Sequence, residues 1–89
     1  MKRSTVMVPW PDGLKFRSAA RIIRAARRYQ SAVVLHCGDR FADVRSIMGI
    51  VMLCAMVGSS ITIEASGGDE QKAIEEVERV FVPVLDDED

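Results

Sequence analysis

The sequence predicts an α+β fold in which four strands and three helices follow one another in the order βαββαβα. Three observations support this prediction. Four short segments combine β-branched and apolar residues at strand spacing, two segments carry an apolar face at helical spacing, and a further apolar run follows a serine suited to capping a helix. Helices with one apolar face need a sheet to cover, so the simplest architecture is a four-stranded sheet with the helices on one side.

The first part of the chain predicts a strand followed by a helix. Residues 4–8 form the strand, which Pro9 and Pro11 end, and residues 11–13 have the composition of a turn. A helix is expected from Phe16 onward. Its buried face is predicted to consist of Phe16, Ala19, Ala20, Ile23 and Ala26. Its opposite face carries an arginine stripe formed by Arg17, Arg21, Arg24 and Arg28.

The middle of the chain predicts two strands and a second helix. Residues 31–37 and 41–43 are expected to be strands joined by a tight turn at residues 38–39. Ser46 stands where an N-cap belongs, so a helix is predicted from residue 47 to about residue 56, with Gly58 ending it. This run is apolar nearly all round, and Ile50 and Leu53 are chosen as its core residues.

The last part predicts a strand and a helix. Ile61 and Ile63 alternate with polar residues, which indicates a fourth strand. Asp69 is expected to cap the final helix. The buried face of that helix is predicted to consist of Ala73, Ile74, Val77, Val80, Phe81 and Val84. Residues 1–85 are expected to form one domain, followed by an acidic tail at residues 86–89.

Composition favours a soluble cytoplasmic protein. The longest apolar stretch, residues 47–57, is far shorter than the roughly 20 residues of a membrane span. The N-terminal residues contain no hydrophobic signal region. Cys37 and Cys54 have no metal-ligand spacing and are expected to be buried thiols. The sequence indicates no cofactor, no metal site and no membrane partner.

The net charge of −1 hides a strong asymmetry along the chain. Residues 1–45 hold ten Lys or Arg against three acidic residues, whereas residues 46–89 hold two against ten. A chain divided in this way can present one basic and one acidic surface, which favours oriented docking with a protein partner.

The chain contains the motifs Gly13-Leu14-x-x-Arg17-x-Ala19-Ala20 and Ser46-Ile47-Met48-Gly49. The first is similar to the motif around the phosphohistidine of the HPr phosphocarriers of the bacterial phosphotransferase system, and the second is similar to the regulatory serine motif of that family. The segment from Gly68 resembles the start of the last helix of these proteins. The resemblance runs from about residue 6 to residue 81. It implies an open-faced β-sandwich, in which three helices cover one face of a four-stranded antiparallel sheet.

The chain departs from this family at the residue that carries phosphate. Lys15 stands at the position of the family's phosphorylated histidine, and Phe16 and Ser18 replace a family alanine and proline. A neutral imidazole can accept and release a phosphoryl group near pH 7, whereas a lysine ammonium has no free lone pair. His36 is expected on a strand, away from this helix end. Lys15 with Arg17 is either a doubly cationic binding spot or a vestigial site.

The resemblance implies that Ser46 is a regulatory phosphorylation site for an ATP-dependent HPr kinase/phosphorylase. A phosphate at this N-cap is expected to gain about 0.3–1 kcal/mol from the helix dipole, with Arg45 adding to it. An ordinary helix cap is the structural alternative for Ser46 alone. Behind the serine, an apolar patch of Ile47, Met48 and Val51 is expected to be a docking surface, toward which the arginine stripe would steer acidic partners.

These observations predict a histidine-less HPr paralogue, similar to the catabolite-repression variant of the family. It would act by binding partners such as the kinase/phosphorylase, a transcription regulator or an enzyme of carbon metabolism. A working phosphocarrier is the first alternative. The second is a nucleic-acid-binding module that uses the arginine stripe with Arg27, against which the acidic second half and the lack of interleaved aromatics argue. No nucleophile and base come together, so no enzyme is expected.

Overall fold

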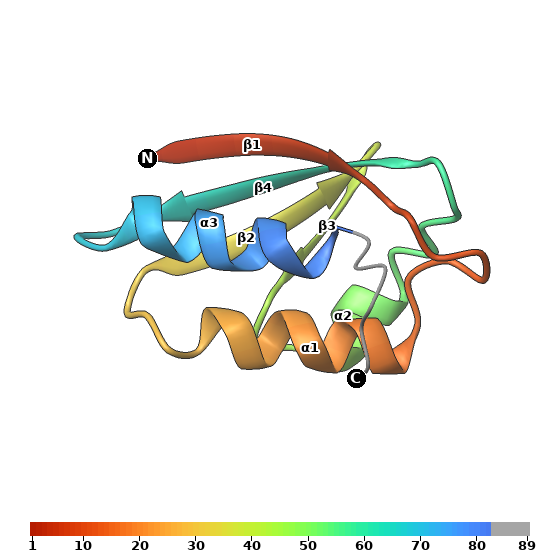
Figure 1. Cartoon of the computed structure of the whole chain (residues 1–89), viewed down its shortest axis with the longest axis horizontal. Coiled ribbons are helices and arrows are strands. Elements are labelled where there is room, and N and C mark those ends of the chain that lie inside the picture. Colours follow the sequence, from red (N-terminus) through yellow and green to blue (C-terminus); the bar gives the residue numbers. More distant parts are fainter. Residues whose placement is uncertain (83–89) are drawn as a thin grey trace.

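A four-stranded antiparallel sheet with the strand order β1-β4-β2-β3 forms the frame of the protein (Figure 1). The computed structural model describes residues 1–82. Its strands are β1 (Lys2–Met7), β2 (Ala32–Cys37), β3 (Arg40–Asp43) and β4 (Ser60–Ser66). The predicted element order is confirmed, and the strand boundaries differ from the predicted ones by one to two residues at most ends.

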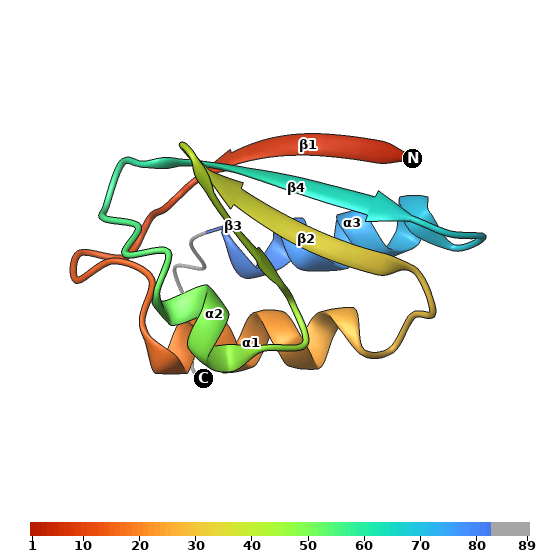
Figure 2. The ribbon, with the colours of Figure 1, turned by 180° about the vertical axis from the view of Figure 1, so that it is seen from behind.

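Three helices cover one face of this sheet, as predicted. They are α1 (Phe16–Ala26), α2 (Ile47–Val51) and α3 (Glu70–Val80). Figures 1 and 2 show α1 and α3 side by side and running in opposite directions, so that the end of α3 and the start of α1 lie at the same end of the molecule. The short helix α2 lies beside the first half of α1. Three predictions lie outside the described residues. They are the domain boundary at residue 85, the acidic tail at residues 86–89 and the burial of Val84.

The core lies between the sheet and the helices. Alternation places Leu35, Ile61 and Ile63 on the helix side of the strands, where they are fully buried. From the helices, Ile22 and Ile50 are buried against them, and Leu53 beyond α2 is also buried. The choice of Ile50 and Leu53 as core residues is therefore confirmed.

The buried face of α1 differs from the predicted one. The buried residues are Ser18, Ala19, Ile22 and Ala26, whereas Phe16 is 54% exposed. These four residues recur at helical spacing on a stripe rotated from the predicted one, which leaves Ala20 and Ile23 half-buried at its flank. The predicted face was therefore correct for Ala19 and Ala26 and wrong for Phe16.

Helix α2 is shorter than predicted, because it ends at Val51 rather than near residue 56. Cys54 adopts a left-handed backbone conformation, with a φ of 55°, which no helix continues through. Leu53 and Ala55 on either side of it enter the core, while Cys54 itself is exposed. The prediction of two buried cysteines was wrong, since Cys37 at the end of β2 is only half-buried.

Asp69 links α3 to the loop that precedes β2. It occupies the N-cap position of α3, but its carboxylate makes no cap hydrogen bond, so the predicted cap role was wrong. It accepts hydrogen bonds from the backbone N–H groups of Gln30, at 2.9 Å, and Ser31, at 3.0 Å, and from the Ser31 hydroxyl. The Ser31 hydroxyl first, and then these N–H groups, hold the pKa of Asp69 below its ordinary value.

Neutralising this carboxylate is expected to lower stability at neutral pH and to matter less in acid. The folded-state pKa of Asp69 is lowered from 3.8, so its stabilisation is present above that pH and is lost as the pH falls through the lower folded value. Thermal unfolding of Asp69→Asn and of wild type should be compared from pH 7 downward. The difference in Tm between wild type and Asp69→Asn should become smaller below about pH 4. Asp39→Asn, at an exposed turn, is the control for the loss of one negative charge.

Candidate functional site

The approach to α1 is fixed by a tight backbone contact with the segment that follows α2. Gly13 has a φ of 82°, and its N–H donates to the carbonyl of Trp10 at 2.9 Å. The next N–H, of Leu14, donates to the carbonyl of Ala55 at 2.9 Å. A side chain on Gly13 would place its Cβ 2.6 Å from that same oxygen. The motif glycine is therefore required here, both for its conformation and for the close approach.

Lys15 is the N-cap residue of α1 and is exposed to solvent. Ser18, one turn later, binds the backbone on both sides of it. The Ser18 hydroxyl accepts from the Lys15 N–H and donates to the Lys15 carbonyl oxygen, both at 3.1 Å. The cap is thus held by the serine through the backbone, and the Lys15 side chain is left to point outward.

A basic groove runs along the outer side of α1 from this end. Its volume is about 710 Å³. The residues that line it are Trp10, Asp12, Gly13, Lys15, Arg17, Ser18, Ala20, Arg21 and Arg24. It thus contains four cationic side chains against the single carboxylate of Asp12. Among residues 1–82, no carboxylate forms an ion pair with any of the three arginines. The structure brings Lys15 and most of the predicted stripe together in a surface suited to acidic ligands.

Arg28 falls outside this groove. Helix α1 ends at Ala26, and Arg27 is its C-cap. The helical spacing that placed Arg28 on the stripe therefore no longer applies at that position. Of the four arginines in the predicted stripe, Arg17, Arg21 and Arg24 line the groove and Arg28 does not.

Ser46 is the N-cap of α2, as predicted. Its side-chain oxygen accepts a hydrogen bond from the Gly49 N–H at 3.0 Å, and the residue is exposed. A Cβ on Gly49 would lie 3.0 Å from this oxygen, so the glycine leaves room for the serine side chain. The expected gain from a helix dipole is reduced, because α2 has five residues and few peptide units to align.

The Arg45 side chain is paired with Asp43. Its guanidinium binds both carboxylate oxygens of Asp43, through Nε at 3.0 Å and Nη2 at 2.9 Å, and its backbone N–H donates to the same carboxylate at 2.8 Å. The hydrogen bonds from Arg45 hold the pKa of Asp43 below its ordinary value, and those to Asp43 raise the pKa of Arg45. A phosphate on Ser46 would therefore have to compete with Asp43 for this arginine.

Exposed methionines follow one another along α2 and the segment after it, and these residues are called the methionine patch. Met48, Met52 and Met56 are 54%, 63% and 70% exposed, and Val57 is exposed beside them. Ile47 and Val51 from the predicted patch are half-buried and pack against the core. The surface is larger than predicted and depends chiefly on methionines. An unbranched, polarisable side chain of this kind adapts to different partners.

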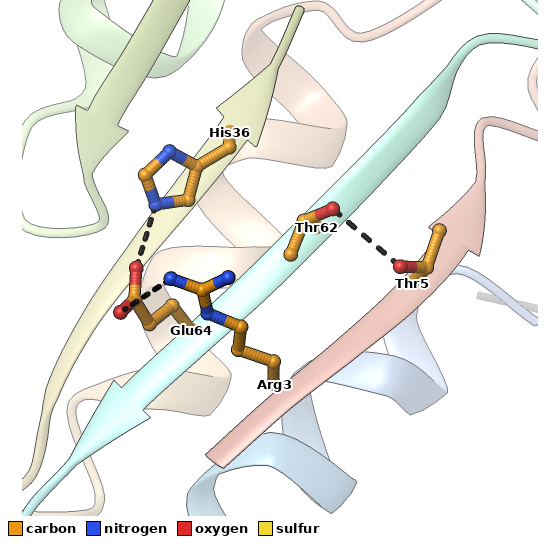
Figure 3. Close-up of polar contacts among 5 residues, drawn as sticks. All are labelled: Arg3, Thr5, His36, Thr62 and Glu64. Carbon is orange, nitrogen blue, oxygen red and sulfur yellow. Dashed lines mark hydrogen bonds and ion pairs between the residues drawn. The ribbon is translucent and has the colours of Figure 1, made fainter. Parts of the chain in front are cut away.

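The single histidine of the chain lies on the opposite, helix-free face of the sheet (Figure 3). His36 on β2 contacts Glu64 on β4 through Nε2 and Oε1 at 2.8 Å. Arg3 on β1 lies 3.6 Å from the other oxygen of that carboxylate. The hydrogen bond from His36 is the main cause of a lowered pKa for Glu64. His36 thus takes part in a cross-strand cluster, while Lys15 and α1 lie on the other side of the sheet.

Residues 1–82 contain neither a candidate metal cluster nor a candidate membrane-spanning helix. This part of the chain holds no cluster of three or more His, Cys, Asp or Glu residues that could bind a metal ion. None of its helices has both the length and the apolar character needed to span a bilayer.

Comparison with known proteins shows the family. The profile described as the PTS HPr component phosphorylation site matches residues 2–82. The chain belongs to the HPr family. It is 40% identical over 63 residues to the phosphocarrier protein HPr of Cupriavidus necator, covering 71% of each chain. It is 35% identical over 77 residues to the HPr-like protein Crh of Bacillus subtilis, covering 86% of this chain and 91% of the relative.

Solved structures of HPr-family proteins have the same fold. HPr-C-His from Thermoanaerobacter tengcongensis superimposes with a TM-score of 0.85 at 28% identity, covering 91% of each chain. Crh from Bacillus subtilis superimposes with a TM-score of 0.69 at 32% identity, covering 93% of this chain and all of the other. The predicted HPr-like sandwich is therefore confirmed. Because HPr-family proteins are non-catalytic carriers, the prediction that the chain is not an enzyme is also confirmed.

Two members of this HPr-family site were missed by the sequence reasoning. Ser18 was noted only as a departure from a family proline, although its spacing of three residues from Lys15 matches that of a capping box. Trp10 lines the groove and contacts Phe81, with ring centroids 5.2 Å apart and ring planes tilted by 44°. No local sequence pattern connects two residues so far apart, so the contact between Trp10 and Phe81 could not be predicted from the sequence.

Proposed function

We propose that this HPr-family chain is a regulator that works by binding protein partners and does not carry phosphate on α1. One observation carries the proposal. Lys15 is the N-cap of α1, where the family resemblance puts the phosphorylated histidine, and the only histidine lies on the far face of the sheet. A lysine ammonium lacks the free lone pair that attacks a phosphoryl donor, so the transfer step has no nucleophile.

The proposed docking surface combines the basic groove with the methionine patch. Helix α2 lies beside the first half of α1, so charged and apolar surfaces adjoin at one end of the molecule. Cationic side chains steer acidic partners and set their orientation, while buried apolar area at the patch supplies affinity. The partners proposed are cytoplasmic proteins: an HPr kinase/phosphorylase, and a transcription regulator or enzyme of carbon metabolism.

Ser46 is the proposed switch of this surface. Ser46 is exposed and stands two residues before Met48, so a phosphate would add about two negative charges near the apolar patch. The same charge would draw Arg45 away from Asp43 and change the local electrostatics. Both effects would alter which partners dock there.

Incubation with ATP and an HPr kinase/phosphorylase is expected to add one phosphate to the chain. Intact mass measures the addition, and Ser46→Ala should abolish it, because the accepting hydroxyl is removed. Ser60→Ala, also exposed, is the matched control and should leave the added mass unchanged. A phosphate that persists in Ser46→Ala would contradict the assignment of this serine.

A working phosphocarrier is the alternative, and one observation favours it. The Cupriavidus relative, at 40% identity, is a phosphocarrier protein HPr. The two functions differ in whether phosphoenolpyruvate and enzyme I transfer phosphate to the chain.

A further inference from the structure

We propose that the basic groove along α1 binds a small organic polyphosphate of the nucleoside di- or triphosphate class. The binding depends only on the residues that form the groove. Its consequence, competition between the nucleotide and acidic partner surfaces, rests on the proposed docking function.

The row of cationic side chains is the first support. Arg17, Arg21 and Arg24 recur at i, i+4 and i+7, so they lie on one face of α1. Lys15 adds a fourth positive charge at the N-cap. Lys15 and Arg24 are nine positions apart, or about 14 Å along a helix axis. An extended chain of phosphates matches such a row better than a single phosphate does.

The start of α1 favours phosphate at one end of this row. The first N–H groups of a helix have no partner within the helix and carry a partial positive charge. The first turn of α1 holds no acidic residue. Among residues 1–82, no carboxylate forms an ion pair with the three arginines of the groove. A bound polyphosphate would supply the negative charge that these described residues do not.

An aromatic wall is the second support. Trp10 is half-buried, lines the groove and is packed against Phe81, with ring centroids 5.2 Å apart. An aromatic ring beside a row of cations suits a nucleotide, because the ring stacks on the base while the cations contact the phosphates. The Asp12 carboxylate, which also lines the groove, can accept a hydrogen bond from a sugar hydroxyl.

The size of the groove favours one nucleotide over a nucleic-acid strand. Its volume of about 710 Å³ lies within the range of about 300–1,000 Å³ that is typical of small-molecule sites. Trp10 is the only aromatic residue among the described residues that line it. The groove can therefore stack one base, whereas proteins that bind a strand stack successive bases on several aromatic side chains.

Titration with ATP, followed by the fluorescence of Trp10 and by backbone amide shifts, tests the proposal. Trp10 is the only tryptophan, so its emission reports on the groove directly. Arg17→Gln with Arg21→Gln is expected to weaken ATP binding about five- to twenty-fold. The control, Arg28→Gln with Lys72→Gln, removes the same charge at exposed positions outside the groove and should stay within about two-fold of wild type.

Three further conditions separate the contributions of the phosphates and the base. Inorganic tripolyphosphate has the phosphates without a base, so it is expected to bind about three-fold or more weakly than ATP. Adenosine has the base without phosphates and should not bind measurably. Mg²⁺ should weaken ATP binding, because it neutralises phosphate charge and Asp12 is the only carboxylate among the described lining residues.

Several results would overturn the proposal. ATP that does not bind, equal weakening in the two double variants, or amide shifts confined to residues outside 10–24 would each exclude a nucleotide site in this groove. Tripolyphosphate that binds as tightly as ATP would exclude a role for the base. A single-stranded oligonucleotide that binds more tightly than ATP would indicate a nucleic-acid strand instead.

The competition with partners has its own readout. ATP is expected to displace a fluorescein-labelled hexa-aspartate peptide from the groove, which fluorescence anisotropy measures. A peptide that binds but is not displaced would contradict the competition. A peptide that binds neither wild type nor any variant would contradict the docking role of the groove, and the ATP titration would still decide whether the groove binds a nucleotide.

Discussion

Enzyme I and labelled phosphoenolpyruvate are expected to leave this chain unmodified, whereas Lys15→His is expected to gain one acid-labile phosphate. The backbone for the transfer is already present. Position 15 is the exposed N-cap of α1, and Ser18 holds its N–H and carbonyl at 3.1 Å whatever the side chain there. A neutral imidazole at this position can accept the phosphoryl group, and the first N–H groups of the helix can stabilise the bound phosphate. The native lysine ammonium cannot accept the group. Autoradiography and intact mass measure the change from background to a stoichiometric product.

Three further variants make this result interpretable. Lys15→Gln should stay unmodified, because removal of the ammonium alone provides no nucleophile. His36→Gln should not change the phosphorylation of either the native chain or Lys15→His, because that imidazole is bound by Glu64 on the other face of the sheet. Lys15→His with Phe16→Ala tests whether the exposed phenylalanine obstructs enzyme I. Incorporation of phosphate into the native chain would contradict the regulatory proposal and support the working phosphocarrier.

Elements whose signals are local were predictable from the sequence. In β4, Ile61 and Ile63 alternate with Thr62 and Glu64, and the pleat alone sends the two pairs to opposite faces. Ser46 was predictable as a cap for the same reason, because its oxygen needs only the N–H of Gly49, three residues on. Such interactions are complete within one turn or strand.

The end of α2 was not predictable, because the segment is apolar on every side. A run that reads Ile-Met-Gly-Ile-Val-Met-Leu has no polar face from which a helical period could be read. The chain cannot continue as a helix where Leu53 and Ala55 enter the core on either side of the exposed Cys54. The left-handed backbone conformation of Cys54 is set by the surrounding fold. Burial of neighbouring residues by the sheet decided this boundary, and local propensity did not.

The electrostatics of the candidate site required the tertiary structure. The sequence placed Arg45 beside Ser46, but the arginine has a better partner in Asp43, whose two oxygens accept from both its Nε and Nη2. In the same way, Asp69 binds the loop that precedes β2 rather than its own helix. Charged side chains with several partners within reach take the one with the best geometry, and only the fold determines which one that is.

Gly13→Ala is expected to destabilise the fold by about 2–5 kcal/mol and to disturb the start of α1 together with it. A left-handed conformation costs an L-residue about 1–2 kcal/mol, and overpacking adds about 1–3 kcal/mol. Gly58→Ala separates the two contributions. Its φ of 87° is close to the 82° of Gly13, yet a Cβ there would meet nothing within 4 Å, whereas at Gly13 it would lie 2.6 Å from the carbonyl oxygen of Ala55.

Urea unfolding followed by the fluorescence of Trp10 measures both free energies. Gly58→Ala should lose about 1–2 kcal/mol, because it carries only the conformational cost. Gly13→Ala should lose more, because the oxygen its Cβ approaches is also the acceptor for the Leu14 N–H, and no flexible side chain can move out of the way. Equal losses in the two variants would contradict the steric role of the Ala55 carbonyl. A larger loss at Gly13, with amide shifts that extend to Lys15 and Ser18, would mean that the turn at Gly13 positions the cap of α1 and, with it, the entrance to the basic groove.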